Sequence, residues 1–216
     1  MHDGGVQDLL DSWAGLIARH TTDPAAADVG RRLIESWSEP HRRYHCLAHL
    51  RDILARVEEL AGDAENLDAV RLAAWYHDAV YDGLPDDEER SAVRAERDLD
   101  GLGVAPELVE EVGRLVRLTL THDPAAGDRN GAVLSDADLA ALALPRDRYR
   151  DNTAAILAEY SHVPTEVFRA NRIQVLVALL EGPGVFRTAR GRKHWEAAAR
   201  ENMRAELADL CVPFAD

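Results

Sequence analysis

Apolar residues in this chain recur at spacings of three and four, and this spacing restricts the fold more than any other feature. Side chains three and four positions apart share one face of an α-helix, whereas a half-buried strand needs strict alternation. No stretch of the sequence alternates in that way. Two of the clearest stripes are Leu47, Leu50, Ile53, Leu54 and Val57, and Leu108, Val112, Leu115, Val116 and Leu120. The pattern predicts an all-α protein.

Turn-forming residues divide the chain into helices and mark no linker between domains. Gly83 and Pro85 interrupt it within residues 82–87, and Pro, Gly, Asp and Asn crowd residues 123–131. The predicted helices span residues 41–60, 67–81, 88–99, 106–120, 133–144, 149–160, 165–180 and 193–210. A chain of 216 residues can bury a single sizeable core. We therefore expect one domain over residues 1–216, with a core at about 31–145 and a helical extension at about 146–216.

The balance of charge and apolarity excludes several classes of protein. The formal net charge is −14, whereas a general nucleic-acid binder carries a basic face. The longest strongly apolar run, residues 173–180, is far shorter than the roughly 20 residues of a membrane-spanning helix. The N-terminus lacks the basic start and apolar stretch of a secretory signal, and the only cysteines are Cys46 and Cys211. We expect a cytoplasmic protein that binds neither nucleic acid nor membranes.

Metal-binding side chains are concentrated in three segments. The first places His45 and His49 four residues apart, on one face of a predicted helix. The second holds the adjacent pair His77 and Asp78, and the third holds two aspartates within residues 136–138. Imidazole nitrogens and carboxylate oxygens together suit first-row divalent metals, and carboxylates also suit magnesium. The segments therefore predict a site for a divalent cation (Mn, Mg, Fe, Co, Ni or Zn) shared by three helices.

The order of these residues resembles the HD superfamily of metal-dependent phosphohydrolases. A histidine, a His-Asp pair and a distant aspartate follow one another as His49, His77, Asp78 and Asp138. More narrowly, the chain resembles a bacterial group described as predicted metal-dependent phosphohydrolases of that superfamily. The segments that carry the resemblance are YHCLAH (44–49), WYHDAVYD (75–82), ERSA (89–92), THD (121–123), SDADL (135–139), EYSHVPTEVF (159–168), NRIQVL (171–176) and ARENMRAEL (199–207). The resemblance implies an HD-domain helical core with additional C-terminal helices.

The resemblance also implies roles for the residues of the site. It makes the four matched residues the metal ligands. Related proteins generally use the aspartate that follows an alanine or another small residue, which selects Asp138, with Asp136 as the alternative. The first segment is similar to the YHNxxH element of cyclic-nucleotide phosphodiesterases, in which the first histidine donates a proton. His45 is then the candidate general acid, with Cys46 in place of the asparagine.

Other polar side chains are candidates for binding substrate or a second metal. Arg42 or Arg43 could hold two phosphate oxygens, because a planar guanidinium matches that geometry. The acidic residues that follow the His-Asp pair could position the attacking water or bind a second metal; they are Asp82, Glu88 and Glu89. His122 could bind substrate or a second metal, or could be a histidine that the C-terminal end of a helix favours.

Three functions are compatible with these residues. The leading one is hydrolysis of a small phosphorylated substrate, a phosphomonoester or nucleotide, by a metal-activated water, with His45 donating to the leaving oxygen. The second is a metal- or nucleotide-binding regulatory module with little turnover, since a fold alone does not fix the chemistry. The third is a di-iron oxygenase of the HD fold, with His45 and His122 completing a second metal site. The helices from Tyr149 onward could cover the core or form a homodimer.

Overall fold

Helices make up all the regular secondary structure of residues 3–211, the part of the chain that the computed structural model describes. In chain order they are α1 (Asp3–Ile17), α2 (Ala26–Trp37), α3 (Leu47–Glu59), α4 (Leu67–Tyr76), α5 (Asp87–Gly101), α6 (Pro106–Leu118), α7 (Arg129–Leu139), α8 (Arg146–Glu159), α9 (Thr165–Glu181), α10 (Ala189–His194) and α11 (Glu196–Leu210). Two short 3-10 helices, η1 (Ala61–Asp63) and η2 (Ala140–Ala143), follow α3 and α7. The described residues contain no strand, so the predicted all-α class is confirmed.

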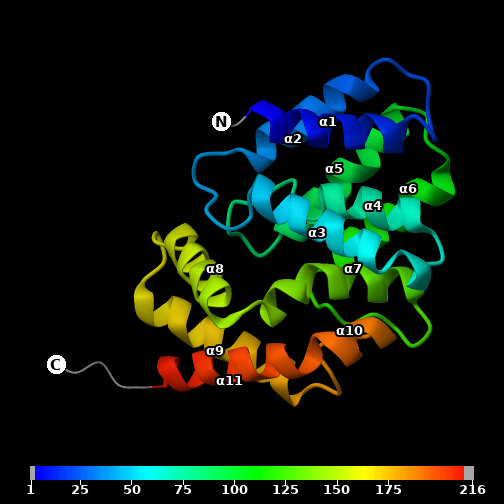
Figure 1. Ribbon diagram of the computed structural model, residues 1–216. Coiled ribbons are helices and arrows are strands. Elements are labelled where there is room, and N and C mark those ends of the chain that lie inside the picture. Colours follow the sequence, from blue (N-terminus) through cyan, green and yellow to red (C-terminus); the bar gives the residue numbers. More distant parts are fainter. Residues whose placement is uncertain (1–2, 212–216) are drawn as a thin grey trace.

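The central helix of the larger apolar core is α4. Its sequence, LDAVRLAAWY, is apolar on nearly all sides, and a helix of that kind has to be surrounded. Helices α1, α3, α5, α6 and α7 all pack against it (Figure 1). Asn66 caps the N-terminus of α4 by accepting a hydrogen bond from the backbone N–H of Ala69. The C-terminal end of this buried helix carries the His-Asp pair, so the pair lies inside the core.

The two N-terminal helices also belong to this core, which begins well before the expected residue 31. Trp13 of α1 and Leu33 of α2 are fully buried in it. Trp13 donates its indole N–H to the carbonyl oxygen of Ala26 at 2.8 Å. The two helices cross closely at Gly30, where a Cβ atom would lie 2.4 Å from the Trp13 ring. A larger residue there would force the helices apart.

Two helix ends beside the metal-capable residues differ from the predicted ones. Helix α3 begins at Leu47 and not near residue 41, because the backbone N–H groups of residues 43–45 donate to the carboxylate of Glu159. Helix α4 ends at Tyr76 instead of residue 81. The chain then turns away, and the N–H of Val80 donates to a serine hydroxyl of α5. His45 consequently lies outside α3, and His49 within it.

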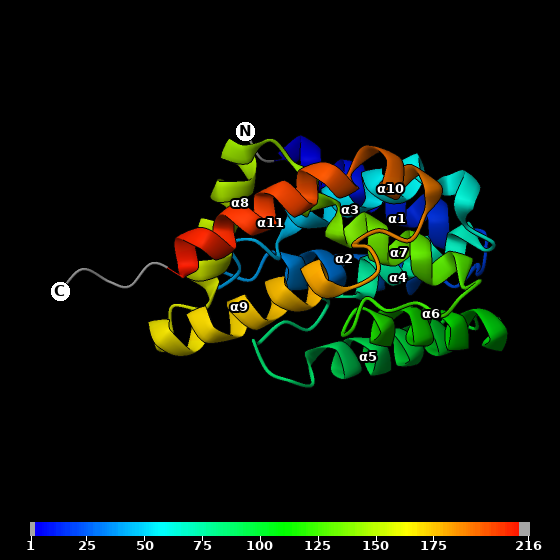
Figure 2. The same cartoon turned by 90° about the horizontal axis from the view of Figure 1, so that it is seen from below.

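The C-terminal helices form a separate layer beneath the core, with α9 and α11 side by side (Figures 1 and 2). The predicted helix at residues 193–210 is two helices, because the backbone leaves the regular helix at Trp195. A second apolar cluster fills this layer; it contains Leu176, Val185, Phe186, Ala199 and Met203. Helix α11 joins the two layers by packing on η2 as well as on α9. None of the helices in residues 3–211 is long and apolar enough to cross a membrane.

Candidate metal centre

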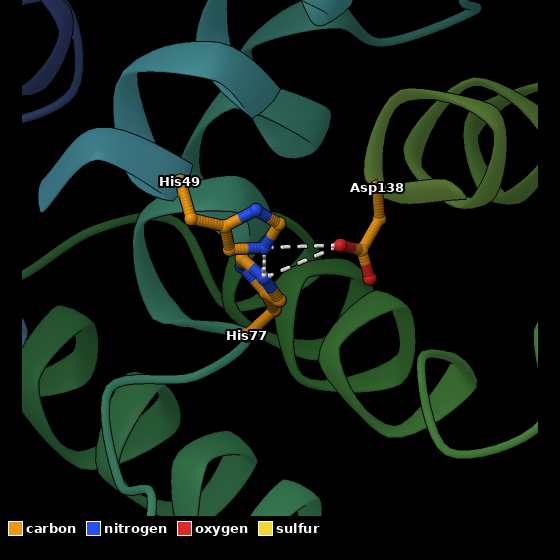
Figure 3. A group of neighbouring side chains, drawn as sticks. All are labelled: His49, His77 and Asp138. Carbon is orange, nitrogen blue, oxygen red and sulfur yellow. Dashed lines mark hydrogen bonds and ion pairs between the residues drawn. The ribbon is translucent and has the colours of Figure 1, made fainter. Parts of the chain in front are cut away.

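The candidate metal centre lies where α3, α4 and α7 meet. His49 is in the first turn of α3, His77 caps the C-terminus of α4 and precedes Asp78, and Asp138 is in the last turn of α7. Figure 3 shows His49, His77 and Asp138 pointing toward one another from these three elements. The three residues form a group that could hold a metal ion.

The donor atoms of four residues lie close together. The Nε2 atoms of His49 and His77 are 3.2 Å apart. Oδ1 of Asp138 is 3.1 Å from His49 Nε2 and 3.8 Å from His77 Nε2. Oδ2 of Asp78 is 3.1 Å from His77 Nε2 and 3.9 Å from His49 Nε2. The Nε2 atom of each imidazole therefore lies within 4 Å of both carboxylates.

Neighbouring groups fix the orientation of both imidazoles. His77 donates its Nδ1–H to the carbonyl oxygen of Ala74 at 2.9 Å, which leaves Nε2 directed at the carboxylates. The Trp37 ring lies 5.3 Å from the His77 ring, and the Tyr44 ring lies 5.0 Å from the His49 ring, between ring centres. His77 is 1% exposed and His49 is 6% exposed. The nitrogens are therefore held in place before any cation arrives.

The charges of the centre stabilise one another. Burial acts to lower the pKa of His77, but the charges of Asp78 and Asp138 and the hydrogen bonds to Asp78 and Ala74 outweigh it and raise the pKa to about 9. Burial acts to raise the pKa of Asp78, but the His77 charge and hydrogen bond hold it at about 2. The pKa of Asp138 is lowered in the same way, against burial, by His77 and His49. Both carboxylates are thus ionised near neutral pH, so the cluster attracts a cation.

The donor set fits a divalent first-row metal or magnesium. Two nitrogens that bind one cation at about 2.1 Å, at right or tetrahedral angles, are about 3.0–3.4 Å apart. The 3.2 Å between the two Nε2 atoms falls in that range. Two carboxylates would balance the charge of the cation, and imidazole suits transition metals. His49, His77, Asp78 and Asp138 are therefore the residues that would hold the metal.

The two aspartates of the third segment have different surroundings. Asp136 is fully buried and accepts hydrogen bonds from the backbone N–H groups of Arg187 and Thr188, at 2.7 and 2.8 Å, and from the Thr188 hydroxyl at 2.7 Å. It therefore fixes the segment before α10. Asp138, two positions later, faces the imidazoles. Of the two alternatives, only Asp138 belongs to the cluster.

A cavity of about 450 Å³ opens beside the cluster and contains His45. Nδ1 of His45 lies 2.7 Å from Oε2 of Glu159, at the end of α8. The other carboxylate oxygen of Glu159 accepts the backbone N–H of His45 at 2.9 Å. The ring of Tyr81 stacks on the His45 ring, with centres 4.1 Å apart. The His45 ring centre is 5.6 Å from that of His49. Glu159 and Tyr81 thus hold His45 against the cavity, next to the cluster.

Two further candidates, Glu88 and His122, also line this cavity. Burial raises the pKa of Glu88, and the charges of Asp78 and Asp87 act in the same direction. His122 has a φ of 50°, a conformation that a residue other than glycine rarely adopts. Its Nε2 is 3.5 Å from Oδ2 of Asp138, and burial lowers its pKa, so the imidazole is neutral. His122 and His49 therefore lie near different oxygens of the Asp138 carboxylate.

Helices α8 and α9 and the connection between them form one wall of the cavity. Most of this wall is apolar or aromatic and consists of Ile156, Tyr160, Val163, Phe168 and Val175. Two polar side chains of α9, Asn171 and Arg172, interrupt it. Arg172 is held by Glu206 of α11 through contacts of 2.8 and 3.0 Å, and Tyr149 donates its hydroxyl to the same carboxylate. The cavity therefore combines one charged end with a largely apolar wall.

The remaining candidates lie away from the cluster. Asp82 is 49% exposed and pairs with Arg90 at 2.8 Å. Arg43 is exposed and contributes its backbone N–H, which Glu159 accepts. Arg42 is buried but donates to the carbonyl oxygens of His45 and Asp78 and to Glu39, so it braces the backbone around the site. Glu89, another of the candidates, pairs with Arg117 at 2.7 Å on the surface.

The sequence reasoning missed Glu159 and Arg172. Both lie in segments that carry the family resemblance, residues 159–168 and 171–176, but a single charged residue in a helix gives no local sign of its partner. Glu159 meets His45 across 114 positions of the chain, and Arg172 meets Glu206 across 34.

Comparison of the chain with family models, with curated proteins and with solved structures gives no match in any of the three. The interpretation of the site therefore depends on its own geometry and chemistry.

Proposed function

We propose that this protein is a metal-dependent phosphohydrolase of the HD superfamily, acting on a phosphomonoester or nucleotide-type substrate. The observation that carries the proposal is the convergence of His49, His77, Asp78 and Asp138 at one end of a cavity that also holds His45. A bound divalent cation supplies Lewis acidity toward a phosphoryl oxygen and lowers the pKa of a water molecule. The residues of the chain supply the binding of that cation, the orientation of substrate and the proton for the leaving group.

His45 is the proton donor of this proposal, and Glu159 is its positioning residue. Oε2 of Glu159 lies 2.7 Å from Nδ1 of His45, where it can accept the Nδ1–H and leave Nε2 for the leaving group. The carboxylate of Glu159 also accepts the N–H groups of residues 43–45, so it holds the backbone of His45 as well as its ring. A leaving alkoxide needs such a proton, because it is a strong base.

The wall of the cavity supports a substrate with an apolar or planar group attached to its phosphate. Tyr160 and Phe168 offer aromatic surface, and Asn171 offers an amide that can donate and accept hydrogen bonds. Glu88 lies in the same cavity, where its carboxylate can accept a proton from water. A volume of about 450 Å³ suits a molecule of nucleotide size.

The position of His122 favours a second cation as an extension of this proposal. Oδ1 of Asp138 faces His49, while Oδ2 lies 3.5 Å from His122, so His122 and Asp138 are the residues that would hold a second cation. Two-metal centres serve phosphate hydrolysis and also the di-iron oxygenases. Oxygen consumption by the iron-loaded protein, without phosphate release, would assign it to the oxygenases.

Phosphate release with added Mn²⁺, Mg²⁺, Co²⁺ or Ni²⁺ tests the proposal. Substrates are a simple aryl phosphate and a panel of nucleoside monophosphates. We expect turnover with at least one cation, and a loss of at least about 100-fold in His77→Ala. His194→Ala is the matched control, since His194 is an exposed histidine of α10 far along the chain from the centre. Full activity in His77→Ala would refute the proposal, and nucleotide binding without turnover would favour the regulatory module.

A further inference from the structure

One face of α9 lines the cavity beside the candidate metal centre. It consists of Phe168, Asn171, Arg172 and Val175, whose spacings of three and four residues place them on the same side of a helix. Two of the candidate metal ligands line the same cavity. A phosphate held at the candidate metal centre would therefore leave this face of α9 to the rest of the substrate.

Arg172 is a hydrogen-bond donor that is fixed on this face. Its Nε and Nη2 atoms donate to the two carboxylate oxygens of Glu206, at 2.8 and 3.0 Å, and the Tyr149 hydroxyl donates to the same carboxylate. The side chains of Arg172 and Glu206 are only 15% and 8% exposed. None of the hydrogen bonds within residues 3–211 uses the third nitrogen of Arg172, Nη1. The N–H groups of Nη1 are thus left for a ligand, and the guanidinium is already ordered before that ligand binds.

The pair of Arg172 and Glu206 adds no net charge to the cavity. Arg172 is the only arginine or lysine in the lining, and the buried carboxylate of Glu206 neutralises it. The carboxyl groups of Asp78, Glu88 and Asp138 line the same cavity. A second anionic group on the substrate would therefore meet no uncompensated cation at this wall. A neutral acceptor, such as a carbonyl oxygen, suits the N–H groups of Nη1 better.

Aromatic side chains beside this donor favour a flat ring as the group that carries the acceptor. Tyr160 and Phe168 both line the cavity, partly buried, with ring centres 5.6 Å apart. Nucleobases stack on such side chains and present hydrogen-bonding groups at their edges. At one edge, guanine-like bases and uracil carry a carbonyl where adenine and cytosine carry an amino group. An amino group there would face the N–H groups of Arg172 donor to donor, which is unfavourable.

We propose that Arg172 is a specificity-determining residue that selects nucleotides whose base carries a carbonyl, and not an amino group, at this edge. Nη1 of Arg172 donates to the carbonyl, and the ring of the base lies against Tyr160 and Phe168. The inference rests on the proposed function for the position of the phosphate. The selection itself can be measured with nucleosides, which carry no phosphate.

Binding of two matched pairs of nucleosides to the full-length protein tests the inference. Inosine and adenosine form one pair, uridine and cytidine the other, and each pair contrasts a carbonyl with an amino group at the same ring position. Isothermal titration calorimetry gives their dissociation constants without any need for turnover. We expect the carbonyl member of each pair to bind at about 1 mM or tighter, and at least about tenfold more tightly than the amino member. The values of kcat/KM for the four monophosphates should follow the same order.

Variants of the pair locate the selection at Arg172. Arg172→Met removes the donors but leaves the buried Glu206 carboxylate without its cation, which destabilises the fold. The double variant Arg172→Met/Glu206→Met removes both charges together. In this double variant we expect the two members of each pair to differ less than about twofold in affinity, with cation content unchanged. Arg204→Met, at an exposed arginine of α11, is the control and should keep the preference of the parent protein.

Four results would overturn the inference. Two concern the parent protein: equal affinity within both pairs, and tighter binding of adenosine or cytidine, which would assign the selection to the amide of Asn171. The third is a preference that persists in the double variant. The fourth is no binding of any of the four nucleosides at about 10 mM, some ten times the expected dissociation constant. A preference for the carbonyl members without hydrolysis of their monophosphates would instead support the inference and refute the proposed function.

Discussion

Asp136 and Asp138 are separated by one alanine, yet α7 gives them opposite surroundings. Residues two positions apart on a helix point in different directions, so only one of the two can face α3 and α4. The motif SDADL by itself did not decide between them, and the family pattern selected Asp138. The contacts give the physical reason: the hydrogen-bonding capacity of Asp136 is taken up by the Arg187–Thr188 segment.

Replacing each aspartate by asparagine separates metal binding from stability. Asp138→Asn removes a charged ligand and is expected to weaken cation binding at least about 100-fold while leaving the fold intact. Asp136→Asn has one oxygen left to accept three donors and is expected to lower the free energy of unfolding by about 1.5–3 kcal/mol. Its cation affinity changes little. Calorimetry and urea unfolding measure the two effects, and a reversal of the pattern would assign the ligand to Asp136.

The raised pKa of His77 makes cation binding depend on pH. With a pKa of about 9, the imidazole holds a proton at pH 7.5, and a metal ligand has to release it. Cation affinity therefore rises as the pH increases from 7 toward 9, by up to about tenfold per pH unit, and levels off above the pKa. Calorimetry in buffers of different ionisation enthalpy should detect about one proton released per cation at pH 7.5. Binding without proton release would contradict the assignment of His77 as a ligand.

At the scale of elements, the loop before α3 depends on a helix that lies far along the chain. Apolar spacing correctly predicted a helix around Leu50 and Ile53, but it placed its start too early, because nothing in residues 41–46 reveals that Glu159 takes their N–H groups. The same contact orients His45. A local pattern cannot predict a contact between distant segments, so the position of His45 was the least predictable part of the site.

Glu159→Gln tests this contact between elements. In this variant the amide oxygen would keep the backbone N–H groups of residues 43–45, so the amide NH2 would face Nδ1 of His45. A donor at Nδ1 excludes a proton there, and an imidazolium acid carries a proton on both ring nitrogens. We expect kcat for an alkyl phosphate to fall by about 100-fold or more, with cation content unchanged. For p-nitrophenyl phosphate, whose leaving group departs without a proton, we expect a much smaller fall in kcat. Glu166→Gln, an exposed position of α9, is the control, and an equal loss on both substrates would contradict the role of Glu159.

At the scale of the molecule, the sequence predicted the helical class and most of the helices from α3 onward, because their apolar stripes are regular. It did not predict α1 and α2. The glycines of α1, among them Gly5 and Gly15, weaken the helix signal, and Gly30 of α2 is explained only by its contact with Trp13. The three segments that meet at the candidate metal centre were predicted from the sequence, because ligand chemistry restricts residue types. The walls of the cavity were not predicted from the sequence, since they combine residues of α8 and α9 with core residues that are far away along the chain.

The metal content of the purified protein tests the central claim most directly. Elemental analysis after growth with Mn, Fe, Co, Ni, Mg and Zn is expected to find at least about one divalent cation per chain. The same preparation of His77→Ala should hold less than about a tenth of that amount, while His194→Ala matches the parent protein. Absence of any bound cation from the parent protein, or equal content in His77→Ala, would contradict a metal centre at His49, His77, Asp78 and Asp138.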